Sequence, residues 1–264
     1  MVNIGLIGDG VVGGAVKFGF QKIGHLVKTH DIKYETTISE VLDTEIIFIC
    51  VPTPSNPDGS CDISNIESCI QELKSNGYKN PIVIKSTVPP GTTESLKQKY
   101  SLNISFVPEF LRERCAIYDF VEKHDLLAIG SEDKVTIETI INCHGTLPKS
   151  VVVMSTSEAE LLKYYSNIFN ALRIIFANEM YEVSKSVGAD YSKIKNAFLK
   201  HSKIPDIYLD VNDNFRGYAG TCLPKDVKAI AYLCKDKNLD LSLFSMLDSE
   251  NEKFKKTVFK GMRL

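Results

Sequence analysis

The chain has 264 residues, of which 44% are hydrophobic and 24% are charged, and its formal net charge is −2. This length suits one large domain or two modest ones, and the composition is ordinary for a globular protein. The balanced charge offers no basic surface for nucleic acid, and no run reaches the roughly 18 apolar residues of a membrane span. We therefore expect neither nucleic acid nor a membrane as a partner.

The first part of the chain alternates strand and helix patterns. Strands separated by helices predict a parallel sheet with right-handed crossovers. The wholly apolar run 46–51 is typical of a strand covered on both faces. We predict a Rossmann-type α/β domain over residues 1–155. Its strands are expected at 2–7, 26–30, 45–51, 81–86, 103–107, 126–129 and 150–154, and its helices at 11–23, 63–76 and 92–100.

From residue 157 the pattern becomes helical. Ser157 and Glu160 have the spacing of a capping box, and the long helix that follows is expected to end near Val187, before Gly188. The loop 202–223 is long and rich in Pro, Asp, Asn and Gly, which is usual for functional or mobile loops. We predict an all-helical domain over 156–264, with further helices at 190–201, 224–237 and 240–261.

Glycines dominate the turn between the first strand and the first helix, in a GxGxxG pattern. Such glycines let the backbone turn tightly and approach a pyrophosphate at the helix N-terminus. Asp31 follows about 20 residues later, where a carboxylate can bind a ribose diol and repel a 2′-phosphate. The pattern favours NAD over NADP, with a plain turn as the alternative. The expected cofactor-binding residues of the turn are Gly8, Gly10, Val11, Val12 and Gly13.

Two more segments end strands at the carboxyl edge of the predicted sheet, where ligands bind in open α/β folds. Val51, Pro52 and Thr53 end the third strand, and Thr87 lies in the segment that ends the fourth. A Thr87 hydroxyl at this edge can hydrogen-bond a cofactor or a water. Turn chemistry alone explains either segment taken separately.

Glu109 and Glu113 follow the fifth strand, four residues apart. On one helical turn, both carboxylates would face the site, and Glu109 would be placed for proton transfer or for activating a water. A solvated acidic turn is the alternative. Lys163 and Asn167 share the same spacing on the long helix, where a lysine can stabilise an oxygen that gains charge and an amide can orient a water. A surface lysine is the alternative there.

The segment 217–226, GYAGTCLPKD, places Cys222 among small residues just before a helix start led by Pro224. The thiol is approachable, and a helix N-terminus favours its thiolate form. A nucleophilic thiol combined with a hydride acceptor can oxidise an alcohol beyond the aldehyde, through a thioester, to an acid.

The seven cysteines are scattered, and no CxxC pair occurs. Neither a zinc site nor a disulfide framework is indicated, and we expect no bound metal. The chain enters a strand almost at once, without the charged leader and apolar run of an export signal. We expect a reduced, cytoplasmic protein.

Taken together, six ordered segments resemble the UDP-glucose/GDP-mannose dehydrogenase family: the GxGxxG turn, VPTP, KSTVPPGTT, VPEFLRE, AELLKYYSN and GYAGTCLPKD. The resemblance covers nearly the whole chain. It implies an NAD-dependent, four-electron oxidation of a nucleotide sugar's 6-hydroxyl to a carboxylate. UDP-glucose is the family's commonest substrate, so UDP-glucuronate for polysaccharide biosynthesis is the expected product.

The resemblance also implies roles for single residues. Cys222 matches the nucleophile that forms a thiohemiacetal and then a thioester, and Glu109 matches the glutamate of thioester hydrolysis. Lys163 and Asn167 match the pair that stabilises oxyanions. The catalytic water is expected between Thr87 and Asp226. Glu113 matches a residue near the nicotinamide, and the stretches that line the sugar site are matched by Phe110, Leu111, Tyr218, Ala219 and Gly220.

Family members usually continue into a second Rossmann-like domain that holds much of the nucleotide, and we expect this sequence to lack it. Two further departures are the short segment between Asp31 and the third strand, and Ala219 where the family has glycine. The resemblance implies homodimerisation through the helical domain. An apolar helix face is consistent with that, although a core face has the same spacing: Leu162, Tyr165, Phe169, Leu172 and Phe176.

Two alternatives to this enzyme stay open. One is a two-electron hydroxyacid dehydrogenase of the related superfamily, which also joins a Rossmann domain to a helical domain with a KxxxN helix. The run from Cys222 to Asp226 argues against it. The other is a truncated, non-catalytic relative that binds NAD or docks to a full-length partner.

Overall fold

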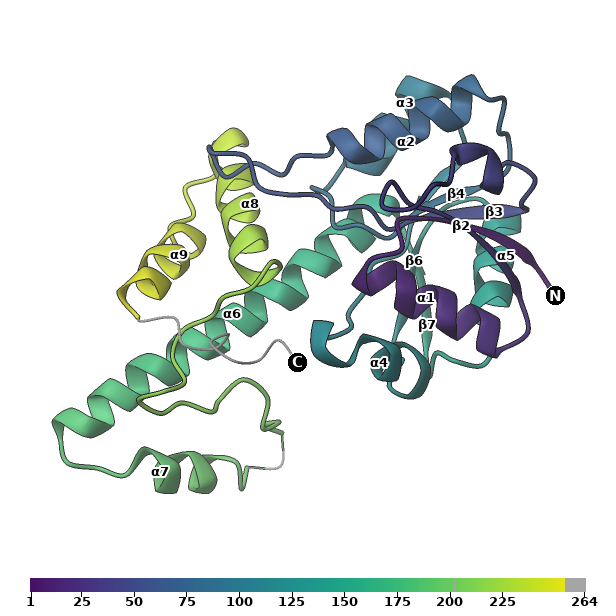
Figure 1. Cartoon of the computed structure of the whole chain (residues 1–264). Coiled ribbons are helices and arrows are strands. Elements are labelled where there is room, and N and C mark those ends of the chain that lie inside the picture. Colours follow the sequence, from purple (N-terminus) through teal and green to yellow (C-terminus); the bar gives the residue numbers. More distant parts are fainter. Residues whose placement is uncertain (202, 255–264) are drawn as a thin grey trace. The chain divides into compact units, whose positions relative to one another are not determined.

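The computed structural model describes residues 1–201 and 203–254, and it divides into two compact units. Unit 1 comprises Met1–Pro54 and Cys61–Lys163. Unit 2 comprises Ser55–Ser60 and the described residues from Tyr164 onward. Figure 1 labels the helices and strands of both.

Unit 1 is built on a seven-stranded sheet in the order β2-β1-β3-β4-β5-β6-β7. The first five strands are parallel, in registers such as Ile4 beside Ile46 and Ile47 beside Ile82. The expectation of a wholly parallel sheet is wrong at one pair, because β6 runs antiparallel to β5 and parallel to β7. The strands are β1 (Asn3–Ile7), β2 (Leu26–His30), β3 (Ile46–Ile49), β4 (Ile82–Ile84), β5 (Ile104–Phe106), β6 (Leu127–Gly130) and β7 (Val151–Met154).

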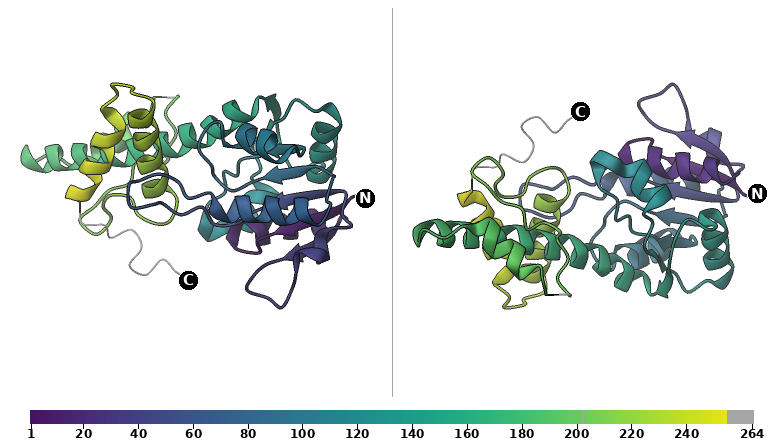
Figure 2. Two further views of the ribbon diagram at one scale, coloured as in Figure 1. Left: turned by 90° about the horizontal axis from the view of Figure 1, so that it is seen from above. Right: turned by 90° about the horizontal axis from the view of Figure 1, so that it is seen from below.

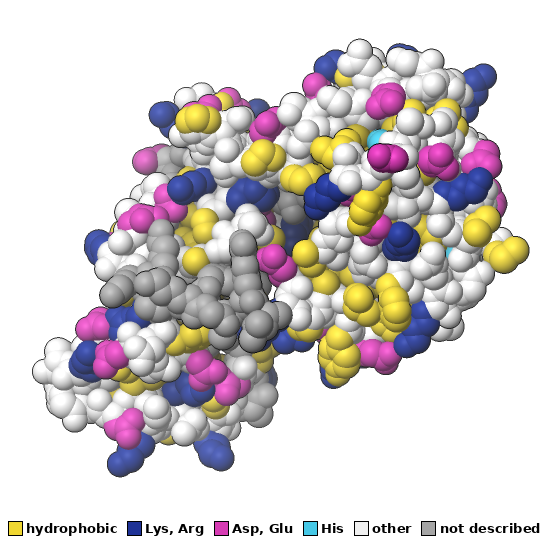
Figure 3. All heavy atoms as spheres, in the orientation of Figure 1, with side chains coloured by type: hydrophobic (Ala, Val, Ile, Leu, Met, Phe, Trp, Pro, Cys, Tyr) yellow, Lys and Arg dark blue, Asp and Glu magenta, His cyan; other side chains and the backbone are white. Residues whose placement is uncertain are grey.

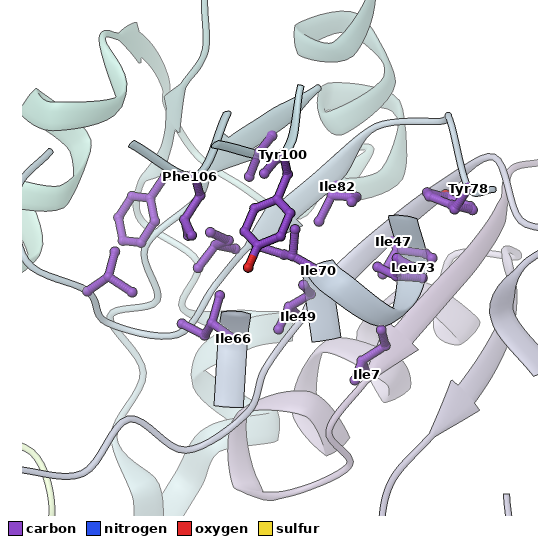
Figure 4. Close-up of a cluster of buried hydrophobic side chains, with 14 of the residues drawn as sticks. Ile7, Ile47, Ile49, Ile66, Ile70, Leu73, Tyr78, Ile82, Tyr100 and Phe106 are labelled. Carbon is purple, nitrogen blue, oxygen red and sulfur yellow. The ribbon is translucent and has the colours of Figure 1, made fainter. Parts of the chain in front are cut away.

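Helices cover both faces of this sheet (Figures 1 and 2). Successive side chains of a strand point to opposite faces, so Ile47 and Ile49 join one core while Ile46 and Phe48 join the other. The first core is closed by α2 (Ser64–Ser75) and α3 (Thr92–Tyr100) and is drawn in Figure 4. The second is closed by α1 (Val11–Lys22), α4 (Ala116–Glu122) and α5 (Lys134–His144).

Two of these helices, α4 and α5, were not predicted from the sequence. The α5 segment is rich in valine, threonine and isoleucine, which favour strands in isolation. Asp133 starts the helix by accepting a hydrogen bond from the Val135 N–H, and Ile140 and Cys143 are buried against the sheet. Capping and burial therefore decide the conformation. Two short 3-10 helices complete unit 1, at Ile38–Val41 and Glu113–Cys115.

The long helix α6 (Thr156–Ser186) begins two residues earlier than the predicted cap at Ser157 implies, with a different capping box. Ser155 and Glu158 form it: the Ser155 N–H donates to Glu158 Oε2 at 2.7 Å, and the Glu158 N–H donates to Ser155 Oγ at 3.3 Å. The pairing of Ser157 with Glu160 is wrong, because Glu160 points into the core of unit 1 with no exposed surface. A Cβ on Gly130 would collide with Thr156 and Ala159, so glycine permits the close approach of α6 to β6.

Unit 2 contains the rest of α6 and the helices α7 (Tyr191–Phe198), α8 (Leu223–Asp236) and α9 (Leu243–Lys253). Ala177 and Tyr181 of α6 pack against Leu209 and Val211 of the segment after α7. The helix expected over 240–261 begins three residues later, and its predicted end from residue 255 onward lies outside the described residues. The predicted Rossmann-type sheet followed by a helical region is confirmed.

The surface carries charges of both signs. On the face shown in Figure 3, basic and acidic side chains are interspersed with hydrophobic ones. Among the described residues, no helix combines the length and apolar character that a bilayer crossing requires.

Candidate active site

The glycine turn of unit 1 has the geometry of a phosphate cradle. Gly8 has φ +93°, a conformation that favours glycine. Gly10 is the N-cap of α1, makes no side-chain cap, and has open space where a Cβ would be. A Cβ on Gly13 would overlap the Gly8 carbonyl, so glycine is required there by packing. The uncapped N–H groups at Val11 and Val12 leave the helix N-terminus available to an anion.

Asp31 lies directly after β2 and faces this turn. Its Oδ2 accepts a hydrogen bond from the Asp9 N–H at 2.6 Å, and its Oδ1 accepts one from the Lys33 N–H at 2.8 Å. Burial opposes ionisation, but these two donors, together with the charges of Lys33 and His30, outweigh it and lower the pKa of Asp31. The carboxylate is thus charged and fixed beside the cradle, as ribose binding requires.

The ends of β3 and β4 are tied together. Thr53 Oγ1 donates to the Thr87 carbonyl at 2.8 Å, and Ser86 Oγ donates to the Val51 carbonyl at 2.6 Å. Thr53 is buried, Pro52 is exposed, and Val51 and Thr87 are half-buried. The predicted residues therefore do meet at one edge of the sheet, and the Thr87 carbonyl rather than its hydroxyl makes the connecting bond.

Glu109 lies in an irregular segment after β5, and Glu113 is exposed at the start of a 3-10 helix. The predicted helical turn that carries both carboxylates is therefore wrong. Arg112 explains the difference: its backbone N–H and its guanidinium both bind the Asp119 carboxylate, and Arg112 itself is extended just before the 3-10 helix. Glu109 Oε1 accepts the Phe110 N–H at 3.0 Å, and Oε2 lies 3.2 Å from the Lys85 ammonium.

Two side chains connect the first turns of α6 to the rest of unit 1. Lys163 Nζ donates to the Glu109 carbonyl at 2.6 Å and lies 5.6 Å from the centre of the Phe110 ring. Glu160 accepts the Gly91 and Thr93 N–H groups at 2.6 and 2.7 Å, which caps α3 in place of a local side chain. Burial raises the pKa of Glu160, against the effect of these donors.

In unit 2, Cys222 is exposed and forms the N-cap of α8. Its carbonyl accepts the Asp226 N–H at 3.0 Å, and its Sγ lies 3.6 Å from Thr221 Oγ1. Gly220 has φ +89°, so the turn before the thiol needs glycine. Pro224 is the second helical residue, one position later than expected.

Asp226 points into unit 2 with 1% of its surface exposed. Its Oδ2 accepts a hydrogen bond from Asn167 Nδ2 at 2.5 Å, and its Oδ1 pairs with Lys225 Nζ at 2.6 Å. The structure thus brings together two residues that are 59 positions apart and that were predicted for the same site.

Tyr218 is also a core residue of unit 2. Its hydroxyl donates to the Leu247 carbonyl at 3.3 Å, and its backbone exchanges two hydrogen bonds with the Asn251 side chain. The hydroxyl and the backbone of Tyr218 are thus bonded within unit 2, and its role in sugar binding stays a prediction.

Sequence reasoning missed Lys85 and misplaced Glu160. A lysine that directly follows the wholly apolar residues of β4 was the available signal for Lys85, because such a position is buried. For Glu160 the spacing to Ser157 was misleading, since Ser155 and Glu158 have the same spacing. Among the described residues, no group of three or more His, Cys, Asp or Glu side chains has the arrangement of a metal site.

Comparison with known proteins gives two matches to one family. The model of the UDP-glucose/GDP-mannose dehydrogenase NAD binding domain matches residues 28–147, and that of the central domain matches 157–253. The UDP-glucose 6-dehydrogenase of Rickettsia bellii is 32% identical over 222 residues, which are 81% of this chain and 50% of that protein. The GDP-mannose 6-dehydrogenase of Pseudomonas aeruginosa is 28% identical over 246 residues, 88% of this chain and 55% of that protein.

A solved UDP-glucose dehydrogenase from the archaeon Pyrobaculum islandicum has a TM-score of 0.88 and 28% identity, covering 96% of this chain and 68% of that one. The chain spans about half the length of the curated relatives it matches. Its glycine cradle and Asp31 fit the predicted cofactor, which is NAD. With one matched domain on its sheet and the other on its helices, the chain belongs to the UDP-glucose/GDP-mannose dehydrogenase family.

Proposed function

We propose that this protein oxidises the 6-hydroxyl of a nucleotide sugar to a carboxylate in two NAD-dependent steps, with UDP-glucose as substrate and UDP-glucuronate as product. The observation that carries the proposal is an exposed thiol at the N-terminus of α8, four residues before a buried carboxylate that is bonded to Asn167. The product fits a role in polysaccharide biosynthesis. Because the thiol must stay reduced, the proposed location is the cytoplasm.

NAD, when bound, supplies the hydride acceptor for both oxidations. Its pyrophosphate would be held by Gly8, Gly10, Val11, Val12 and Gly13, and its ribose by Asp31. The edge formed by Val51, Pro52, Thr53 and Thr87, together with Glu113, would complete the cofactor site. In this proposal, the 6-hydroxyl loses its proton to solvent and Lys163 stabilises the resulting alkoxide. Departure of the first hydride from C6 then converts the alkoxide to the aldehyde.

Cys222 then attacks the aldehyde carbon. A C–S bond forms, and the aldehyde oxygen gains the charge that Lys163 and Asn167 stabilise. Loss of the second hydride converts the thiohemiacetal to a thioester. Glu109 takes a proton from water as the water oxygen bonds to the thioester carbon, and the C–S bond breaks to release Cys222 as thiolate. Thr87 and Asp226 are proposed to hold this water.

The sugar is proposed to contact Glu109, Phe110, Leu111, Lys163, Asn167 and the turn from Tyr218 to Gly220. Both UDP-glucose and GDP-mannose dehydrogenases are among the relatives. Family membership alone therefore does not select between these two nucleotide sugars, and UDP-glucose is proposed as the substrate.

We also propose a homodimer formed through α6. Large apolar side chains of this helix are exposed in the single chain, at positions that repeat on one helical face. Exposed apolar groups of this size mark interaction sites when they are contiguous. Sedimentation equilibrium should give twice the monomer mass, and Phe169→Ser should reduce it. The face includes Tyr165, Phe169, Phe176 and Val183.

The decisive experiment measures NADH formed per UDP-glucose consumed by the purified 264-residue chain. Two NADH per sugar support the proposal, and Cys222→Ser should abolish the second. One NADH, with activity that survives Cys222→Ala, would indicate a two-electron dehydrogenase instead. NAD binding without binding of either nucleotide sugar would indicate a non-catalytic relative, and GDP-mannose serves as the control for specificity.

A further inference from the structure

Lys85 is a buried cation with one charged partner. It directly follows β4, its side chain is 1% exposed, and its ammonium lies 3.2 Å from Glu109 Oε2. Lysine is rarely this buried unless it is paired. Within the described part of the chain, no other carboxylate forms an ion pair with Lys85.

The described neighbours of Lys85 also include an aromatic ring and two histidines. The ammonium lies 5.9 Å from the centre of the Phe120 ring. Burial lowers the pKa of the neighbouring His124 and His144, and the charge of Lys85 adds to this effect on both. These imidazoles are therefore neutral, and the buried positive charge is balanced by Glu109.

The pair also leaves Glu109 in a defined orientation. Oε2 is buried beside the ammonium but accepts no hydrogen bond of good geometry from a described residue. Oε1 accepts the Phe110 N–H at 3.0 Å. A carboxylate oxygen can accept more than one hydrogen bond, so Oε1 keeps capacity for a water while Oε2 is directed at Lys85.

We propose that Lys85 is a positioning residue for Glu109: its ammonium holds this carboxylate oriented to accept a proton from the hydrolytic water. The inference rests on the proposed function of Glu109 in thioester hydrolysis. The proposed function assigns Lys85 no contact with the sugar or the cofactor. Its loss should therefore slow the hydrolysis step while the two oxidations continue.

A double-mutant cycle tests whether Lys85 and Glu109 act as a unit. Lys85→Met, Glu109→Gln and the double variant are unfolded in urea. Removing one partner of a buried pair leaves an unpaired charge or an empty acceptor, whereas removing both does not. The sum of the two single changes in unfolding free energy predicts an unfolding equilibrium constant for the double variant. The measured constant should be smaller than this prediction by at least about tenfold. Additive effects would overturn the inference without any assay of activity.

The chemical consequence is measured by rapid quench and intact-protein mass spectrometry, with UDP-glucose and NAD. Lys85→Met should accumulate a sugar adduct on Cys222 after forming two NADH per active site, and Lys85→Arg should accumulate less. Val83→Ala is the matched control, because Val83 is also buried and lies on β4, the strand that Lys85 follows. The loss of its side chain should destabilise the protein without an adduct.

The outcomes separate the two proposals. If the wild type turns over normally and Lys85→Met also turns over without an adduct, the inference is overturned and the proposed function stands. Equal loss of oxidation and hydrolysis in Lys85→Met shows a purely structural role and also overturns it. A wild type that forms neither NADH nor an adduct overturns the proposed function, and the hydrolytic role of Lys85 fails with it.

Discussion

The two compact units hold their predicted reactive groups in opposite ways. In unit 1, Glu109 is half-buried between the Lys85 ammonium and the Phe110 N–H, and its carbonyl accepts a bond from Lys163. In unit 2, Cys222 is exposed at a helix N-terminus, and its sulfur lies 3.6 Å from Oγ1 of the adjacent Thr221. Stability and the proposed reactivity are therefore expected to be coupled in unit 1, whereas in unit 2 the proposed nucleophile is separate from the buried groups that stabilise the fold.

The largest expected effect on stability comes from Glu160 in unit 1. Glu160→Ala leaves the Gly91 and Thr93 N–H groups without an acceptor at the start of α3. Each buried, unsatisfied donor costs roughly 1–3 kcal/mol, so we expect a loss of about 3 kcal/mol in urea unfolding. Glu158→Ala is the matched control on the same helix turn: its capping box is exposed, and it should cost about 1 kcal/mol or less. Equal losses would contradict the role assigned to Glu160.

The next effect concerns the buried pair of unit 2. Asn167→Ala removes the donor to Asp226 Oδ2, while the Lys225 ion pair remains. A loss of about 2 kcal/mol is expected, because a hydrogen bond to a charged group contributes roughly 1.5–3 kcal/mol. Asn196→Ala, at an exposed position of α7, should change stability by less than about 0.5 kcal/mol. If both substitutions are neutral, the Asn167–Asp226 bond does not stabilise unit 2.

Acid should destabilise unit 1 through His124 and His144. Burial lowers the pKa of both below the ordinary value of 6.5. Below that pH, the unfolded chain binds more protons than the folded one, so stability falls as pH falls. Each histidine contributes a slope of up to about 1.4 kcal/mol per pH unit. The charged groups that act on them include Lys85 and Glu109.

The measurement is urea unfolding between pH 7.5 and 5.5. His144→Asn and His124→Asn should each make the dependence on pH shallower, and the double variant should be the shallowest. An unchanged slope in the double variant would mean that other groups control acid stability.

Sequence alone predicted the elements whose local pattern agrees with their burial. The apolar runs of β1 and β3 and the regular spacing of α6 gave their positions within a few residues. It missed α5, because a segment of valine, threonine and isoleucine becomes helical only through the Asp133 cap and the contacts of Ile140. The antiparallel β5–β6 pair likewise depends on the path of the chain through α4.

The site was predictable where motif and position coincide, and less so where contacts are long-range. Gly8, Gly13 and Asp31 have conformations and contacts that follow from the motif. The pairing of Lys85 with Glu109 could not be predicted from the sequence. It joins side chains at the ends of two neighbouring strands, and no sequence spacing indicates such a contact. The hydrogen bond between Asn167 and Asp226 likewise became evident only from the structure, because the two residues are far apart in the sequence.

Substitution of Cys222 should have the smallest effect on stability and the largest effect on activity. Cys222→Ser should change the free energy of unfolding by less than about 0.5 kcal/mol, because an exposed side chain loses few contacts. Cys234→Ser is the matched control on the same helix: Cys234 is 5% exposed, and burying a hydroxyl there should cost about 1–3 kcal/mol while NADH formation persists. The pair is compared by urea unfolding and by NADH yield per sugar. If Cys222→Ser unfolds as readily as Cys234→Ser, the nucleophile of unit 2 is part of its stable core, and the contrast with unit 1 disappears.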